Sequence, residues 1–341
     1  MAITIALNGA LGLLPVLVFL AALLQSDSFK LVRFRFVLAL IGAGAGAAVV
    51  SYFVGRALLQ SLNIGYEDFT HFGGPLLEEA LKAAILIGLI RMNRIGFTLD
   101  AAISGFAVGA GFAVAENYFY LQVLGTGAPA LWVVRGFGTA IMHGGAAALF
   151  ALMGHLLAQR GATAALRFVP GFVAASALHI AFNQFTEFPV SSTIAMFSGL
   201  AAAMALVLHR GSKSVDQWLK IDYEAQRRLL DQIRSGKFAD DSIGRKVEIL
   251  RSRLHPYQVS DILRYMELHT ELVIEAQEVL SARDRGADIE LGKPLREKLA
   301  RYRVIEEEVG QAVRIALGGH LHFSRQDFFQ LYTLKRDSRR V

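Results

Sequence analysis

The chain has 341 residues, of which 54% are hydrophobic and 19% are charged. Soluble domains carry about 25% charged residues, and the charges here are unevenly distributed. Residues 1–210 contain 19 charged residues, whereas residues 211–341 contain 45. This distribution excludes a single soluble globular domain. It predicts an all-α fold with a polytopic membrane domain over residues 1–210 and a soluble domain over residues 211–341.

The formal net charge of +6 is shared between these two parts. Neither part has the concentrated basic surface that is typical of a nucleic-acid-binding protein. We therefore expect the lipid bilayer, and no nucleic acid, as a partner. The chain contains no cysteine, which excludes disulfides, thiolate metal ligands and a cysteine nucleophile.

A membrane-spanning helix needs about 20 apolar residues, and seven stretches of the first 210 residues meet this requirement. They are residues 3–24, 34–55, 71–90, 100–122, 132–158, 165–186 and 189–209. Basic residues gather in the loops after the first, third, fifth and seventh stretches, and the alternate loops hold only Arg56 and Arg135. The positive-inside rule then predicts a plasma or inner membrane protein with its N-terminus outside and its tail in the cytoplasm.

Two glycine pairs, Gly42 with Gly46 and Gly105 with Gly109, have the small-xxx-small spacing that permits close packing of helices. In the tail, apolar residues recur at helical spacing over residues 214–235, 257–282 and 295–317. We therefore expect a small cytoplasmic α-helical domain, seven transmembrane helices in the bundle, and glycine contacts between some of those helices.

Polar side chains occur inside four of the expected spans, where a charged group costs at least about 2.5–3.5 kcal/mol. The four spans carry, in order, Glu78, Glu79 and Lys82; Glu116; His143; and His179 with Asn183. Lys82 follows the two glutamates by four and three residues, so all three can share one helix face. Adjacent carboxylates repel each other in a low-dielectric medium, and a nearby ammonium allows one to stay ionised. This arrangement favours a general base.

The depths of these groups are similar. At the helical rise of 1.5 Å per residue, the outer ends of the spans lie ~12 Å from Glu79, ~9 Å from Glu116, ~10 Å from His179 and ~17 Å from His143. The groups are therefore predicted to form one layer in the outer half of the membrane.

This layer has the groups that peptide hydrolysis needs, namely a base for water and donors for the oxyanion and the leaving amine. Two mechanisms remain open. In one, Glu116, His143 and His179 hold Zn²⁺ and Glu78 is the base; in the other, a glutamate-type enzyme uses Glu78 without a metal. The chain lacks an HExxH motif, a pair of deep aspartates and a rhomboid-type serine motif, which excludes those intramembrane hydrolases.

The ordered motifs Glu78-Glu79-x-x-Lys82, Phe112-x-x-x-Glu116-Asn117, His143 and His179-x-x-x-Asn183 resemble those of the PrsW family of intramembrane proteases. The resemblance covers roughly residues 65–190. More distantly, the motifs resemble EExxxR, FxxxH and HxxxN of the type II CAAX prenyl endopeptidases. The resemblance implies a peptidase that cleaves single-span or membrane-anchored substrates, as PrsW-like members clip an anti-sigma factor on its outer side.

The resemblance also implies a role for each site residue. Glu78 would activate water, and Glu79 and Lys82 would tune it. Glu116 and His143 would hold the water or a metal, and His179 with Asn183 would stabilise the oxyanion. Lys82 and Glu116 stand where the CAAX relatives have Arg and His.

The cytoplasmic tail lies outside the resemblance, and we expect it to regulate the enzyme or to form a homo-oligomer. The alternative function is a proton-coupled transporter or channel that uses the same buried Glu, His and Lys groups. Against this alternative, the sequence shows no internal repeat of the kind found in many transporter folds.

Overall fold

The computed structural model describes residues 2–25, 27, 32, 34–62, 65–160, 162–184, 188–237, 245, 248–249, 251–252, 256–284 and 293–309. Every regular element among these residues is a helix. The chain divides into two compact units, Met1–Ser212 and Lys213–Val341, which are described one at a time below. The expected all-α class with a polytopic membrane bundle is confirmed.

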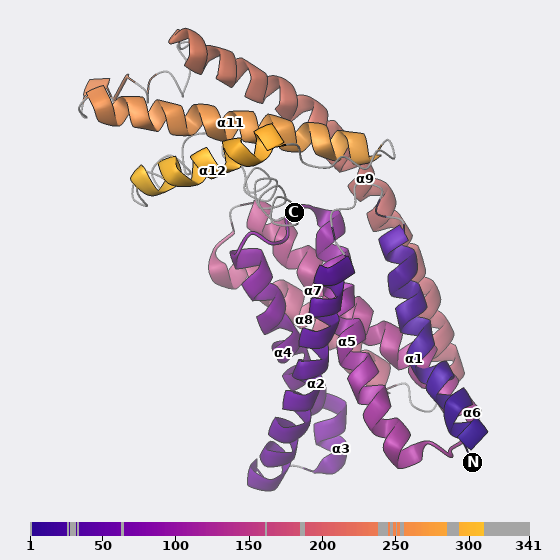
Figure 1. Ribbon diagram of the computed structural model, residues 1–341. Helices are drawn as coiled ribbons and strands as arrows, with labels where there is room; N and C mark the ends of the chain where they lie inside the picture. The colour runs from indigo at the N-terminus through magenta and orange to yellow at the C-terminus, as the bar shows by residue number, and fades with distance from the viewer. Residues whose placement is uncertain are drawn as a thin grey trace. The chain divides into compact units, whose positions relative to one another are not determined.

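The membrane unit is a bundle of long helices joined by short turns (Figure 1). In chain order its elements are α1 (Ala2–Gln25), α2 (Phe34–Leu62), α3 (Tyr66–Asp68), η1 (Phe69–Gly73), α4 (Gly74–Arg91), α5 (Thr98–Leu124), α6 (Pro129–Val133), η2 (Val134–Thr139), α7 (Ala140–Gln159), α8 (Ala164–Gln184) and the first part of α9 (Pro189–Ser235). The elements η1 and η2 are π-helical turns, which often mark functional sites.

Six of the described helical stretches are long and apolar enough to cross a membrane. They are Ala2–Gln25, Phe34–Leu62, Thr98–Leu124, Pro129–Gln159, Leu166–Gln184 and Pro189–Val207. The seventh expected span, at residues 71–90, corresponds to η1 and α4. Its lower apolarity has a simple cause, because α4 carries Glu78, Glu79, Lys82 and Arg91.

Helices α5 and α7 form the centre of the bundle. About four-fifths of their spanning residues are buried, whereas most of those in α1, α2, α8 and α9 are not. A Cβ atom at Gly105 would lie 2.6 Å from the Ala147 carbonyl oxygen, and one at Gly109 would lie 2.1 Å from that of His143. These two glycines therefore let α5 approach the α7 backbone, as their spacing predicts.

The prediction for the other glycine pair is wrong. No described atom of another helix lies within 4 Å of a Cβ built at Gly42 or Gly46. The close approach of α2 to α5 instead uses Gly44, whose Cβ would lie 1.9 Å from the Val108 carbonyl oxygen, and Gly111, whose Cβ would lie 2.0 Å from that of Ile41. The spacing of small residues identified the correct helix but the wrong face.

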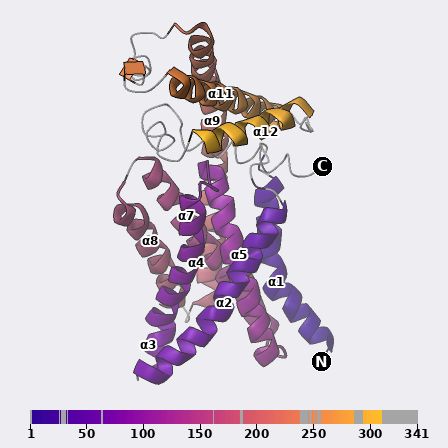
Figure 2. The same cartoon turned by 60° about the vertical axis from the view of Figure 1, so that its left-hand side comes forward.

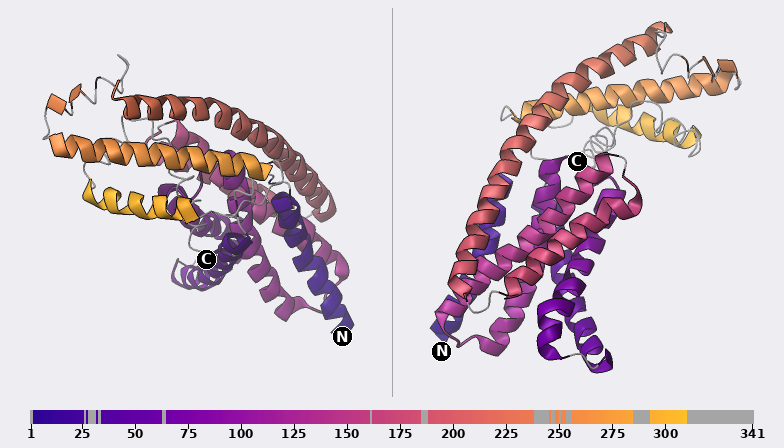
Figure 3. Two further views of the ribbon diagram at one scale, coloured as in Figure 1. Left: turned by 45° about the horizontal axis from the view of Figure 1, so that its top comes forward. Right: turned by 180° about the vertical axis from the view of Figure 1, so that it is seen from behind.

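The second unit contains the end of α9, α11 (Pro256–Asp284) and α12 (Lys293–Glu308), and views of it are given in Figures 2 and 3. These helices bury an apolar core that includes Leu229, Met266, Leu272 and Tyr302. Helix α9 continues from Pro189 to Ser235, so the expected span 189–209 and the expected tail helix 214–235 are parts of one helix. A single glycine costs a helix only about 1 kcal/mol, and Gly211 is not followed by proline. The end of the predicted helix 295–317 lies outside the described residues.

Candidate active site

Four helices of the membrane unit each contribute part of the predicted polar layer. Helix α4 carries Glu78, Glu79 and Lys82, α5 carries Glu116, and α7 carries His143, while α8 carries His179 and Asn183. Glu79 is 2% exposed and Lys82 is 0% exposed, so both charges are buried inside the bundle. Such burial requires partners for each charge.

Glu79 is the centre of the first set of contacts. Its Oε1 atom accepts hydrogen bonds from Lys82 Nζ at 2.6 Å and from His179 Nδ1 at 2.8 Å. Because a carboxylate only accepts, the proton of neutral His179 is placed on Nδ1. The other ring nitrogen, Nε2, then keeps its lone pair and lies 3.9 Å from Glu78 Oε2.

His143 is the centre of the second set. Its Nδ1 atom lies 2.9 Å from Lys82 Nζ, and its Nε2 atom lies 3.1 Å from Glu116 Oε2. An ammonium only donates, so Nδ1 accepts from Lys82 and Nε2–H donates to Glu116. The His143 ring meets that of His179 edge to face at 4.8 Å. Lys82 therefore links two carboxylates and two imidazoles into one network.

Arg135 of η2 also belongs to this network, although the sequence pattern did not assign it to the site. Its Nη2 atom lies 3.3 Å from Glu116 Oε2, its Nε atom donates to Asn117 Oδ1 at 2.9 Å, and its guanidinium lies 3.8 Å from the centre of the Tyr120 ring. Arg135 therefore holds Glu116 and the helix turn around it. The feature of the sequence that could have indicated this role is the position of Arg135 eight residues before His143, about two helical turns away on the same face.

Asn183 lies at the edge of the site. Its Nδ2 atom donates to the Thr70 carbonyl oxygen at 3.3 Å and so connects α8 to η1. The role of Asn183 as an oxyanion donor remains a prediction. The observed contact holds η1, which lines the cavity, against α8.

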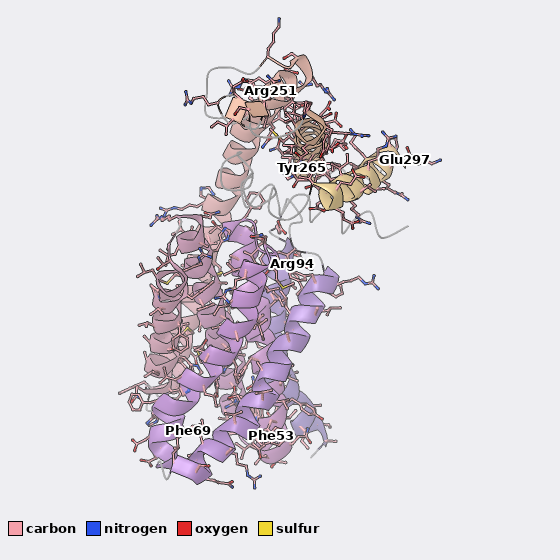
Figure 4. All side chains as sticks on the ribbon, turned by 90° about the vertical axis from the view of Figure 1, so that its left-hand side faces the viewer. Phe53, Phe69, Arg94, Arg251, Tyr265 and Glu297 are labelled. Atoms are coloured by element: carbon pink, nitrogen blue, oxygen red, sulfur yellow. The ribbon has the colours of Figure 1, made fainter. Side chains whose placement is uncertain are left out.

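A cavity of about 750 Å³ opens beside this network. It is bordered by α2, by the segment from Tyr66 to Glu78, and by α5 from Phe112 to Tyr120. Of the predicted site residues, the two that line it are Glu78 and Glu116. The buried imidazoles and Lys82 form the layer behind these carboxylates. Phe53 and Phe69, which also line the cavity, lie at one end of the membrane unit, and Arg94 lies at the other (Figure 4).

The side chains present also fit a metal ion. Glu78, His143 and His179 each offer one ligand atom, and these atoms lie within 4.8 Å of one another. Two imidazoles and one carboxylate are a common ligand set of catalytic zinc. The Glu79 carboxylate orients His179 through its distal ring nitrogen, as carboxylates do for metal-bound histidines. The sequence pattern proposed Glu116 in place of Glu78 as the third ligand, and that choice stays untested.

Comparison with protein families agrees with this geometry. A family profile described as PrsW family intramembrane metalloprotease matches residues 32–209. The chain belongs to the PrsW family. The match includes every residue of the network described above. Searches of curated proteins and of solved structures found no match.

Membership of this family makes the chain a membrane protein of a protease family. It does not favour the transporter or channel alternative.

Proposed function

We propose that this PrsW-family chain is a peptidase that cleaves single-span or membrane-anchored proteins in the outer half of the membrane. One observation carries the proposal: ionisable side chains from α4, α5, α7 and α8 form one connected network that ends in Glu116 on a cavity, and Glu78 lines the same cavity 3.9 Å from His179 Nε2. Each of these groups is costly to place in a membrane. A shared chemical task explains why all of them are present.

In this proposal Glu78, His143 and His179 hold a zinc ion. When bound, such an ion would act as a Lewis acid on a water molecule and a carbonyl oxygen. Glu116 borders the same cavity and accepts the proton of the attacking water. Arg135 holds the Glu116 carboxylate in place, and Glu79 holds the His179 ring. Lys82 compensates the charge of Glu79 and contacts His143, which fixes the α4–α7 distance.

The metal and Glu116 compete for one atom. His143 Nε2–H donates to Glu116 at 3.1 Å, and Nδ1 accepts from Lys82. An ion shared with Glu78 and His179 would need the lone pair of Nε2, so the ring proton would have to move to Nδ1 and both of these hydrogen bonds would be replaced. In a metal-free, glutamate-type enzyme, Glu78 would instead be the base that activates water. The two mechanisms therefore assign opposite roles to the two cavity carboxylates, and measurements on these residues separate them.

The proposed side of cleavage follows from the loop charges. If basic loops face the cytoplasm, the α2–α3 turn and the cavity beside it lie toward the extracytoplasmic face. We propose the plasma or inner membrane as the location. An extracytoplasmic site suits a regulated protease whose substrate resembles an anti-sigma factor, as the family resemblance suggests.

The central test is cleavage of a tethered single-span reporter by the purified full chain in liposomes. We expect cleavage by the wild type and a loss of at least about 10²-fold, the lower end of the usual contribution of a catalytic group, in Glu78→Gln and His179→Ala, which would each remove a proposed zinc ligand. The matched control is Glu67→Gln, which alters an exposed carboxylate of α3 and should keep full activity. Wild-type rates in both site variants would refute the proposal.

Metal analysis of the same preparations decides the mechanism. We expect close to one zinc per chain in the wild type, loss of zinc in Glu78→Gln, and retained zinc with low activity in Glu116→Gln. The reverse pattern would support Glu116 as the third ligand. Full activity after chelation to metal-free protein would establish the glutamate-type mechanism.

A further inference from the structure

The cavity beside the site arises from the way in which α2 and α5 cross. The two helices are in backbone contact at Gly44 with Val108 and at Ile41 with Gly111. Beyond this point they diverge toward the α3 end of the membrane unit, as the views in Figures 1, 2 and 3 agree. Gly74 and Glu78 of α4 also line the space between them. The cavity is therefore a cleft between these two helices, on the α3 side of their crossing.

The dimensions of the cleft suit an extended peptide. Its α2 wall runs from Ala48 to Gln60, a rise of about 18 Å at 1.5 Å per residue. An extended chain rises about 3.3 Å per residue, so the wall matches about five residues. In a helix each backbone carbonyl is bonded within the helix, and a scissile carbonyl must be free to meet the catalytic groups. An unwound, extended segment satisfies both conditions.

The lining has an unequal distribution of charge. Most of its residues are apolar or aromatic, and its charged members are Arg56, Glu78 and Glu116. Arg56 is exposed, and no carboxylate among the described residues lies within ion-pair distance of it. It is located on the part of α2 that is nearer to α3 than Ala48 is. The cleft therefore has two carboxylates, Glu78 and Glu116, and toward α3 one cation, Arg56, that has no ion-pair partner among the described residues.

We propose that this cleft is the substrate groove, and that it binds an extended segment of about five residues with an acidic side chain against Arg56. The acidic residue would lie on the α3 side of the scissile bond, among otherwise apolar residues that contact α2 and α5. This inference rests on the proposed peptidase function and specifies its substrate class. The occupant is a protein segment, and an anionic lipid headgroup at Arg56 is the competing outcome.

Binding in the cleft can be tested without any cleavage, because the chain has no cysteine. Val49 lines the cleft and is 53% exposed, whereas Leu38 lies on the same helix outside the cleft and is 50% exposed. We expect a single-span reporter with one cysteine in its extracytoplasmic five-residue segment to crosslink to Val49→Cys and not to Leu38→Cys. Equal crosslinking at both positions, or none at Val49→Cys while the wild type cleaves the reporter, would overturn the groove. Crosslinking without any cleavage would refute the peptidase function and leave the groove in place.

The role of Arg56 is tested by reversing charges on both partners. Reporters carry Glu, Gln or Lys at successive positions of the five-residue segment, and cleavage is measured in zwitterionic liposomes. At one position we expect the wild type to cleave the Glu reporter about fivefold faster than the Lys reporter, as for one exposed ion pair. Arg56→Glu should reverse this order. The matched control, Arg35→Gln, alters an exposed arginine at the opposite end of α2 and should keep the wild-type order.

Two outcomes would contradict the assignment of Arg56. One is an unchanged order of the reporters in Arg56→Glu while all of them are cleaved. The other is a change in cleavage rate on adding anionic lipid that is equal for all reporters and is absent in Arg56→Gln. This result would identify a lipid headgroup as the ligand of Arg56.

Discussion

Each unit of this protein contains a cluster of opposite charges, and the two clusters differ in what surrounds them. In the membrane unit, Glu79 and Lys82 are 2% and 0% exposed, and their contacts extend to both site histidines. In the tail, Arg234 contacts Glu267 and Glu271, and Lys298 contacts Glu271 and Glu275. The side chain of Arg234 is 51% exposed and that of Lys298 is 29% exposed.

This difference in exposure determines whether each cluster is explained by stability or by chemistry. Exposed ion pairs typically contribute 0–1 kcal/mol and form wherever charged helices meet in water, so the tail cluster needs no chemical function. Buried charges cost several kcal/mol each, and their pairing often does no more than offset that cost. Apolar residues would stabilise the membrane unit equally well. The buried cluster is therefore better explained by chemistry than by stability.

The largest expected effect follows from removing one buried charge. Lys82→Met should leave Glu79 uncompensated and lower the free energy of unfolding by about 3–5 kcal/mol. Thermal unfolding in detergent, followed by near-ultraviolet circular dichroism, measures this loss.

The double variant Glu79→Gln with Lys82→Met sharpens the comparison. The glutamine oxygen can still accept from His179, and no charge is left unpaired, so stability should return to within about 1 kcal/mol of wild type. Proteolytic activity should stay low. A double variant as unstable as Lys82→Met would show that the cluster has a mainly structural role.

The second effect tests whether helix packing holds the buried cluster together. Gly109→Ala places a methyl group 2.1 Å from the His143 carbonyl oxygen, which should cost about 1–3 kcal/mol and move Glu116 away from His143. Activity should fall with stability. Gly46→Ala is the matched control, because it meets no described atom of another helix within 4 Å; a similar loss there would mean that the α5–α7 contact is not the cause.

Much of the fold could be predicted from the sequence because a bilayer imposes strong rules. The expected spans 3–24, 34–55 and 100–122 lie within α1, α2 and α5. The expected span at 71–90 is helical in η1 and α4, but it is not among the six described stretches that are long and apolar enough to cross a membrane. The division of the chain at residue 210 was an expectation from charge alone, and the structure divides it at Ser212, within α9.

The parts that could not be predicted depend on the rotation of helices about their own axes. Sequence spacing gives the relative depth of Glu116 and Arg135 but not whether their side chains face each other. For the same reason the pattern favoured Gly42 and Gly46 over Gly44. It also could not show that ligand atoms of Glu78, His143 and His179 lie within 4.8 Å of one another, because that proximity depends on the packing of three helices.

The third effect concerns Arg135, which joins the buried cluster to the surface of the cavity. Arg135→Lys retains a positive charge but cannot contact Glu116, Asn117 and Tyr120 together, because lysine lacks the planar fork. We expect kcat to fall about tenfold, which corresponds to about 1.4 kcal/mol, with little change in KM or in zinc content. Such a result identifies a positioning residue. A rise in KM with an unchanged kcat would instead indicate that Arg135 binds the substrate.

The smallest effect is expected in the tail. Burial alone would lower the pKa of Lys298, but hydrogen bonds from this residue to Glu275 and Glu271 outweigh burial and raise its pKa above the ordinary value. A raised pKa in the folded state means that the stabilisation is complete below the ordinary value of about 10.4 and is lost only as the pH rises through the raised value. The contribution of Lys298 should therefore be constant around neutral pH.

Hydrogen exchange of the α11 amides in the full chain can measure this contribution. Lys298→Met should speed their exchange by at most about fivefold, because a partly exposed pair contributes no more than about 1 kcal/mol. After correction for intrinsic rates, the difference from wild type should be equal at pH 6 and pH 8 and should shrink in high salt. A loss as large as that in Lys82→Met, or a difference insensitive to salt, would remove the contrast between the solvated and the buried cluster. The remaining explanation would then be that both clusters are structural.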